Sequence, residues 1–290
     1  MRIDFRILGL AVAGSALIGL AQMAACTGDS GGGASGTGGS TGAPGANGGT
    51  TGTPGGTGGS TAAAAGVACA KPIVLTKPGI ANFDNYDSAS DLSTWNFPLG
   101  GDTTSSILAG TFGYGDRPNG LPETFMMITP GSSSTYALEV ADTASAQYGG
   151  GMGIWISECL DAKSFSGVSF WTRGSAPTGK AKLSILMKET TAATPAKTGN
   201  KTGTCPGTDT TCIHPNYMFT VTDTWTQIQI PWASFTKGDA AGTPVTPDGS
   251  NIWQIQFDIG LNWVPGPTDG GAYVPVPGAY KLDVDTITFY

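Results

Sequence analysis

Six residues with aromatic or planar polar side chains are the best candidates for a binding site. They lie in three segments that alternate apolar and polar residues, and they are Trp155, Trp171, Arg173, Gln254, Gln256 and Asp258. Because successive side chains of a strand point to opposite sides, we expect these six to point away from the core and to share one surface. Trp offers a flat apolar ring with one donor, and Gln, Asp and Arg offer planar hydrogen-bonding groups. This mixture suits a sugar ring, which has apolar C–H faces and a rim of hydroxyl groups.

The same six residues allow a second interpretation. A loop or a second sheet could cover this face, and Trp155 and Trp171 would then belong to the core. The sequence leaves both interpretations open.

The segments that carry these residues read as β-strands. In 252–261, Ile255, Phe257, Ile259 and Leu261 share the side that we expect to face the core. Similar short runs are separated by clusters of Gly, Pro, Asn and Asp throughout the C-terminal part of the chain, with 46 Gly and 19 Pro in total. The expected strands are 73–76, 107–113, 135–140, 152–157, 167–173, 182–188, 217–222, 225–231, 252–261 and 280–289. This pattern predicts an all-β fold, a two-sheet antiparallel jelly-roll sandwich.

Composition excludes several classes of function. The formal net charge is −7, which argues against a nucleic-acid partner because binding phosphates needs a basic surface. The single His, His214, rules out a site that needs two imidazoles, as most zinc enzymes do. No Gly-x-Ser-x-Gly motif is present, and none of the four Glu residues is marked as one of a catalytic pair.

Residues 1–25 are typical of an export signal. Arg2 and Arg6 precede an apolar stretch from Ile7 to Leu20, which is too short for a confident membrane span. The stretch ends in Met23-Ala24-Ala25-Cys26, which resembles the bacterial lipobox, whose cysteine becomes lipidated. The resemblance implies a lipid on Cys26 and a place on the bacterial cell envelope, at the outer membrane or cell surface. Ordinary cleavage after Ala25, leaving Cys26 a free thiol, is the alternative.

Residues 26–66 form the predicted linker. This segment is rich in Gly, Ser, Thr, Ala and Pro and carries one charge, Asp29. It cannot bury a core and is expected to be disordered. Residues 67–290 then form one domain, which we expect to be monomeric and to contact the membrane only through the lipid.

Four further cysteines predict two disulfides in an exported chain. Three pairings are possible. We favour Cys205–Cys212, which closes a short polar loop, and Cys69–Cys159, which would tie the start of the domain to a central strand.

Several stretches resemble carbohydrate-binding modules with a galactose-binding-like jelly roll, particularly family 11. They are Ile80–Asp87, Phe165–Gly174, the Trp-x-x-x-x-Ile-Pro-Trp stretch of 225–235, and Leu282–Phe289. The resemblance covers about residues 78–290. It implies a two-sheet sandwich that binds β-glucan or a related polysaccharide on a concave face. It also implies a structural Ca²⁺ where the first and last strands meet, with Asp84 and Asp285 as its carboxylate ligands.

Together these observations favour a non-catalytic, surface-anchored lipoprotein that binds a polysaccharide of the β-glucan type. An envelope adhesion or structural protein that binds another protein is the first alternative. A glycoside hydrolase or lyase is the second, and it requires two carboxylates about 5–9.5 Å apart.

Overall fold

The computed structural model describes residues 72–88, 90–92, 94–102, 105–117, 120–145, 149–194, 202–208, 211–264 and 272–290. The predicted signal peptide, the lipidated Cys26 and the linker lie outside these residues and stay predictions. In the described part of the chain, no helix has the length and apolarity needed to span a membrane.

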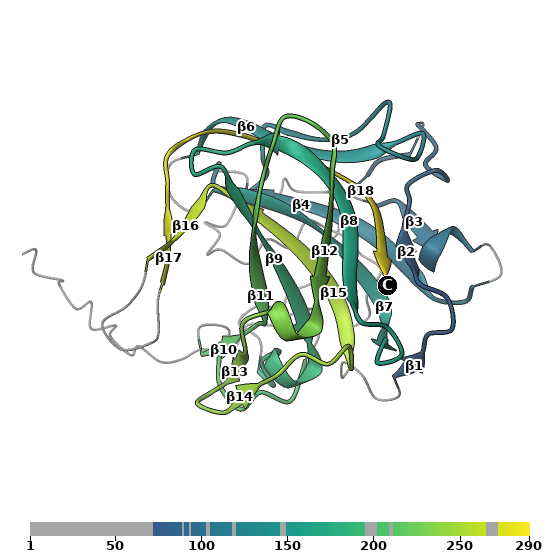
Figure 1. Ribbon diagram of the computed structural model, residues 1–290, viewed down its shortest axis with the longest axis vertical. Helices are drawn as coiled ribbons and strands as arrows, with labels where there is room; N and C mark the ends of the chain where they lie inside the picture. The colour runs from purple at the N-terminus through teal and green to yellow at the C-terminus, as the bar shows by residue number, and fades with distance from the viewer. Residues whose placement is uncertain are drawn as a thin grey trace, which may run out of the picture. The chain divides into compact units, whose positions relative to one another are not determined.

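Two antiparallel sheets dominate the fold (Figure 1). The first has the strand order β11-β9-β15-β7-β4-β3, and the second has the order β12-β8-β18-β6-β5. The strands of the first sheet are β3 (Asn96–Pro98), β4 (Leu108–Gly115), β7 (Gly150–Asp161), β9 (Lys180–Met187), β11 (Asn216–Thr220) and β15 (Ile252–Ile259), with β1 (Ile73–Val74) parallel beside β7. The strands of the second are β5 (Thr124–Ile128), β6 (Ala137–Ser145), β8 (Gly167–Ser175), β12 (Thr226–Pro231) and β18 (Gly278–Phe289), with β2 (Gly79–Ala81) beside β18. The prediction of an all-β antiparallel sandwich is confirmed.

Short strands form two further, separate sheets. A small sheet contains β10 (Cys212–Ile213), β13 (Gly238–Ala240) and β14 (Pro244–Val245), and a two-stranded one pairs β16 (Leu261–Val264) with β17 (Ala272–Pro275). Single 3₁₀ turns are η1 (Leu99–Gly101), η2 (Lys188–Thr190) and η3 (Trp232–Ser234).

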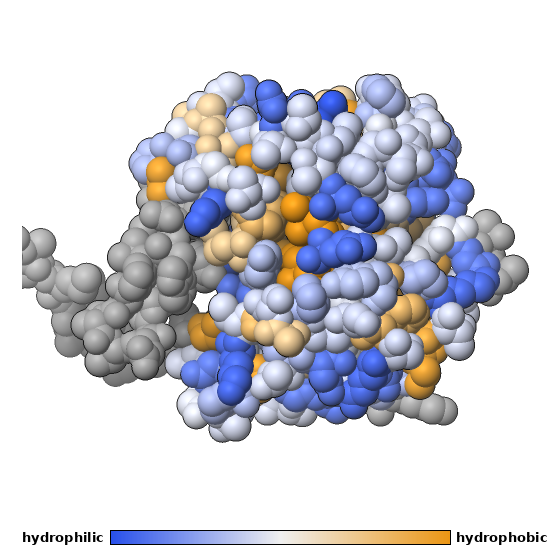
Figure 2. Space-filling view, viewed as in Figure 1, coloured by the Kyte–Doolittle hydropathy of each residue, from blue (hydrophilic) through white to orange (hydrophobic). Residues whose placement is uncertain are grey.

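The core lies between the two sheets, and aromatic rings from both fill it. Phe170 of β8 packs edge-to-face against Phe219 of β11 and Phe257 of β15, with ring centres 5.1 and 5.0 Å apart. Ile255, Phe257 and Ile259 are fully buried, as their alternation predicts. Figure 2 shows apolar residues along the middle of the viewed face, bordered by hydrophilic ones.

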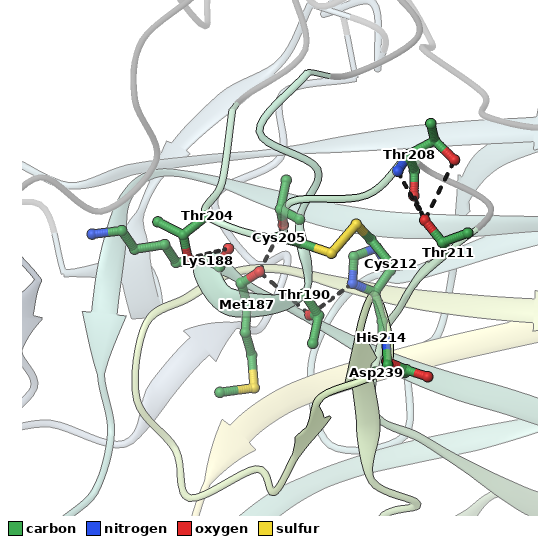
Figure 3. The surroundings of a disulfide bond; sticks show 12 residues. Met187, Lys188, Thr190, Thr204, Cys205, Thr208, Thr211, Cys212, His214 and Asp239 are labelled. Atoms are coloured by element: carbon green, nitrogen blue, oxygen red, sulfur yellow. Dashed lines mark hydrogen bonds between the residues drawn. A yellow bond between two sulfur atoms is a disulfide. The ribbon is translucent and has the colours of Figure 1, made fainter.

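A disulfide joins Cys212 of β10 to Cys205 in the preceding loop, which confirms that predicted pair (Figure 3). Both cysteines are buried, and Nδ1 of the nearby His214 lies 2.9 Å from Oγ1 of Thr190. Cys159 is also disulfide-bonded, and β1 pairs with the end of β7 just beyond it. Cys69 lies outside the described residues, so the Cys69–Cys159 pair stays a prediction.

Replacing Cys205 and Cys212 together by Ser should lower the free energy of unfolding by about 2–3 kcal/mol, because the disulfide restricts a short loop of the unfolded chain. Urea denaturation of the two proteins measures this difference. An unchanged midpoint would show that the loop is held by its other contacts.

Candidate binding site

The strand register divides the six predicted site residues between the two sheets. Trp155 of β7 lies directly opposite Gln254 of β15 in the first sheet. Trp171 and Arg173 belong to β8 in the second sheet, where they pair with β18. Side chains that point away from the core on the two sheets of a sandwich lie on opposite sides of the molecule. The prediction that all six share one surface is therefore wrong for Trp171 and Arg173.

The outer side of the first sheet holds the other four residues. Directly opposed residues of antiparallel strands lie on the same side of a sheet, so the register defines three rows across β4, β7, β15 and β9. The rows are Tyr114–Gly151–Asp258–Lys182, Phe112–Gly153–Gln256–Ser184 and Gly110–Trp155–Gln254–Leu186. We call these twelve residues the Trp155 face.

Three aromatic side chains of the Trp155 face lie flat across glycines of the neighbouring strand. A Cβ on Gly110 would stand 2.6 Å from Cε2 of Trp155, and one on Gly153 would stand 2.6 Å from Cε1 of Phe112. The rings of Phe112 and Tyr114 are nearly parallel, with centres 6.4 Å apart. Trp155 is only 9% exposed. The expected solvent-reachable indole is therefore not observed, and the half-buried amides of Gln254 and Gln256 offer the more accessible polar groups.

A chain of hydrogen bonds follows β15 along this face. Nε2 of Gln254 donates to Oε1 of Gln256 over 3.1 Å. Nε2 of Gln256 in turn donates to Oη of Tyr114 and to Oδ1 of Asp258, both over 2.9 Å. The hydroxyl of Tyr114 donates to the same carboxylate. The amides of the site are thus held in a set orientation.

Asp258 at the end of this chain is balanced by a cation. Nζ of Lys182 lies 3.2 Å from Oδ2 of Asp258, and Oγ of Ser184 donates to the same oxygen over 3.3 Å. Burial and the neighbouring Asp258 raise the pKa of Tyr114 well above 10, so its hydroxyl stays protonated and keeps donating. Asp258 is the only carboxylate in the three rows, and it is already engaged.

The other end of the chain has unused hydrogen-bonding groups. Nε1 of Trp155 is buried and has no hydrogen-bond partner among the described residues. Gln254, directly opposite, uses Nε2 to donate to Gln256, and its Oε1 accepts no hydrogen bond from the described part of the chain. An unpaired buried donor costs about 1–3 kcal/mol. A ligand hydroxyl that donates to Oε1 of Gln254 displaces no contact of the described residues.

On the opposite sheet, Arg173 is engaged within the protein. Its Nε donates to Oδ2 of Asp283 over 2.7 Å, and its Cζ lies 4.7 Å from the ring centre of Trp225. Trp171 is half-buried and lies between Gln227 and Asp285 in the register. Arg173 is thus engaged in contacts within the second sheet and its neighbouring loop.

Asp283 is the most perturbed carboxyl group of that face. Its side chain is fully buried beside Glu139, Arg173 and Lys281. Burial, helped by the neighbouring Glu139, raises the pKa of Asp283 to about 6 against the opposing effects of Arg173 and Lys281.

This raised pKa predicts a measurable pH dependence. Between about pH 4 and 6 the folded protein binds a proton at Asp283 that the unfolded chain has released, so the free energy of unfolding contributed by this group falls as the pH rises through that interval. Over this interval the native chain should lose about 1–2 kcal/mol of unfolding free energy relative to Asp283→Asn. The loss is smaller than the full pKa shift implies, because the partly exposed Arg173 and Lys281 screen part of the effect. Denaturation curves at a series of pH values measure the difference, and parallel curves would contradict it.

The two predicted calcium ligands have hydrogen-bond partners in one segment, 132–135. Backbone N–H groups of Ser132 and Ser133 donate to Oδ2 of Asp285, and the backbone N–H of Thr135 donates to Oδ1 of Asp84. N–H groups that point at these oxygens take positions a cation would need. No cluster of three or more His, Cys, Asp or Glu suited to a metal occurs among the described residues. The donor set does not fit Ca²⁺ well, and calcium binding stays a prediction.

A hollow of about 290 Å³ opens at one end of the second sheet. It is lined by Glu123, Thr124, Ala141, Asp142, Thr143, Ser175, Ala279, Tyr280 and Lys281. Its carboxylates are already paired, since Nε of Arg117 lies 2.8 Å from Oδ2 of Asp142 and Oγ1 of Thr143 donates to Glu123 over 2.6 Å. A ligand here would have to displace these contacts.

No protein-family model and no curated protein matches the chain. Among solved structures, it is similar to a family 11 carbohydrate-binding module from Clostridium thermocellum in complex with a beta-1,3-1,4-mixed-linked tetrasaccharide, at 18% identity and a TM-score of 0.38, over 67% of this chain and 94% of that one. It is also similar to a family 30 module of a cellulosomal cellulase from the same organism, at 10% identity and a TM-score of 0.32, over 61% and 90% of the two chains. A protein described as sugar-binding from Bacteroides thetaiotaomicron gives 10% identity and a TM-score of 0.32, over 62% and 87%. Likeness at this level is one of fold and assigns no ligand to this chain.

Proposed function

We propose that this chain binds a polysaccharide of the β-glucan type on the Trp155 face, without catalysis, and is held on the bacterial cell envelope by a lipid at Cys26. The observation that carries the proposal is the unused end of the hydrogen-bond chain. Oε1 of Gln254, at that end, accepts no hydrogen bond from the described residues, so the half-buried amide keeps an acceptor for a ligand. The indole of Trp155, directly opposite Gln254 in the register, leans the other way over Gly110 and forms an apolar floor beside it.

The chemistry of this face suits a neutral sugar. Lys182 and Asp258 neutralise each other, so neither a uronate nor an amino sugar finds an unpaired counter-charge in the three rows. One carboxylate, already engaged, cannot provide the acid and base of a glycoside hydrolase. Each hydrogen bond to a sugar hydroxyl contributes about 1 kcal/mol, so we expect micromolar or weaker affinity.

Affinity electrophoresis tests the proposal. The full chain is run in gels that contain mixed-linkage β-glucan, xyloglucan or mannan, and we expect retardation in at least one. Gln254→Ala should weaken binding about tenfold, because it removes the amide that faces the ligand and releases Gln256.

Gln227→Ala is the matched control, since Gln227 is an exposed strand glutamine of the opposite sheet. It should leave retardation unchanged. Loss of binding in Gln227→Ala or Trp171→Ala, with Gln254→Ala unaffected, would place the ligand on the second sheet. A chain that no glycan retards would overturn the proposal and favour a protein partner.

A further inference from the structure

We infer that Tyr114 is a positioning residue that sets the hydrogen-bonding pattern of the site without touching the ligand. Held across Gly151, it fixes the amide of Gln256 and, through it, the amide of Gln254. The inference rests on the proposed function for the ligand, whereas the hydrogen-bond chain can be examined without any glycan.

Tyr114 crosses a whole strand to reach its partners. It belongs to β4, whereas Gln256 and Asp258 belong to β15, and β7 lies between them. The crossing passes over Gly151, which stands between Tyr114 and Asp258 in the same row. A Cβ on Gly151 would stand 2.5 Å from Cζ of Tyr114. The missing side chain of Gly151 therefore makes the bridge possible.

The bridge determines which way the two amides point. Nε2 of Gln256 donates to both Oη of Tyr114 and Oδ1 of Asp258, which stand next to each other because the Tyr114 hydroxyl donates to that carboxylate oxygen. Its Oε1 must then face the other way, toward Nε2 of Gln254. This fixes the amide of Gln254 in turn, with its carbonyl oxygen left for a ligand. Removing the Tyr114 hydroxyl deletes one of the two acceptors that hold Gln256 and the donor that holds Oδ1 of Asp258, so the amide loses its set position.

A fixed amide matters for selectivity. A Gln254 that is held in one orientation offers its acceptor and its second N–H at set positions. Preorganised groups lose less entropy on binding and reject ligands with the wrong pattern of hydroxyls. Tyr114 is buried and contributes through this arrangement.

A double-mutant cycle on the full chain distinguishes positioning from contact. Tyr114→Phe keeps the ring over Gly151 and should weaken binding to mixed-linkage β-glucan about fivefold. In a Gln254→Ala background the same change should have no further effect, because the amide that it orients is gone. Losses that multiply in the double variant would mean that Tyr114 binds the glycan directly and would overturn the inference. Tyr217→Phe, on β11 of the same sheet, is the matched control and should change nothing.

A glycan-free measurement keeps the inference separate from the proposed function. In ¹⁵N-correlated NMR spectra, the side-chain NH₂ signals of Gln254 and Gln256 should shift in Tyr114→Phe and stay in place in Tyr217→Phe. Signals of Gln254 that do not respond to the loss of the hydroxyl would overturn the inference. If they respond but no glycan binds the native chain, the proposed function fails and the hydrogen-bond relay stands.

Discussion

Asp258→Ala should lower the free energy of unfolding by about 3–5 kcal/mol, the largest effect that we expect from a single polar residue. The change leaves Lys182, whose side chain is only 15% exposed, without its counter-charge. It also removes the acceptor of Tyr114, Gln256 and Ser184. Breaking a buried ion pair by removing one partner is costly because the remaining charge stays desolvated. Urea denaturation of the folded chain measures the change.

Asp248→Ala provides the matched control for this prediction. Asp248 also pairs with a lysine, Lys163, over 3.5 Å, but both side chains are more than half exposed. Exposed pairs contribute little, so this variant should lose no more than about 1 kcal/mol. Equal losses in the two variants would show that the Asp258 pair is not buried as described.

Trp155→Ala should cost about 3–5 kcal/mol of stability and abolish glycan retardation. The indole is buried against Gly110, so truncation leaves a void that the neighbouring strand cannot fill. Trp155→Phe separates packing from binding, because it keeps a ring over Gly110 and deletes only the indole N–H and part of the ring. The loss of an unpaired donor offsets part of the lost packing, so we expect stability within about 1 kcal/mol of the native chain. Because Nε1 is buried, binding should stay within about twofold of the native affinity. A Phe variant with much weaker binding and unchanged stability would contradict the burial of Nε1.

The alternation of side chains predicted the core more reliably than the site. It correctly placed Ile255 and Phe257 inside, because which side of a strand a residue occupies depends only on its neighbours in the chain. It could not place Trp171 and Trp155 on different sheets. That choice depends on pairing between distant segments, such as Arg173 of β8 with Asp283, 110 residues further along the chain.

The residues that organise the site were missed for a related reason. Tyr114 carries no local signal, since its importance comes from a row that joins three strands. The glycines in 149–153 were the available clue, because glycine on a central strand often marks the close approach of another group. The burial of Trp155 likewise depends on Gly110 of another strand, which no pattern within 152–157 could reveal.

A glycan that binds the outer side of the first sheet must lie over the Trp155 face. Indole N–H signals in ¹⁵N-correlated NMR spectra of the full chain, recorded while a mixed-linkage β-glucan oligosaccharide is added, test this most directly. The indole signal of Trp155, assigned with Trp155→Phe, should move during the titration, and those of Trp171 and Trp225 should remain where they are. Movement of the Trp171 signal with Trp155 unaffected would contradict the claim.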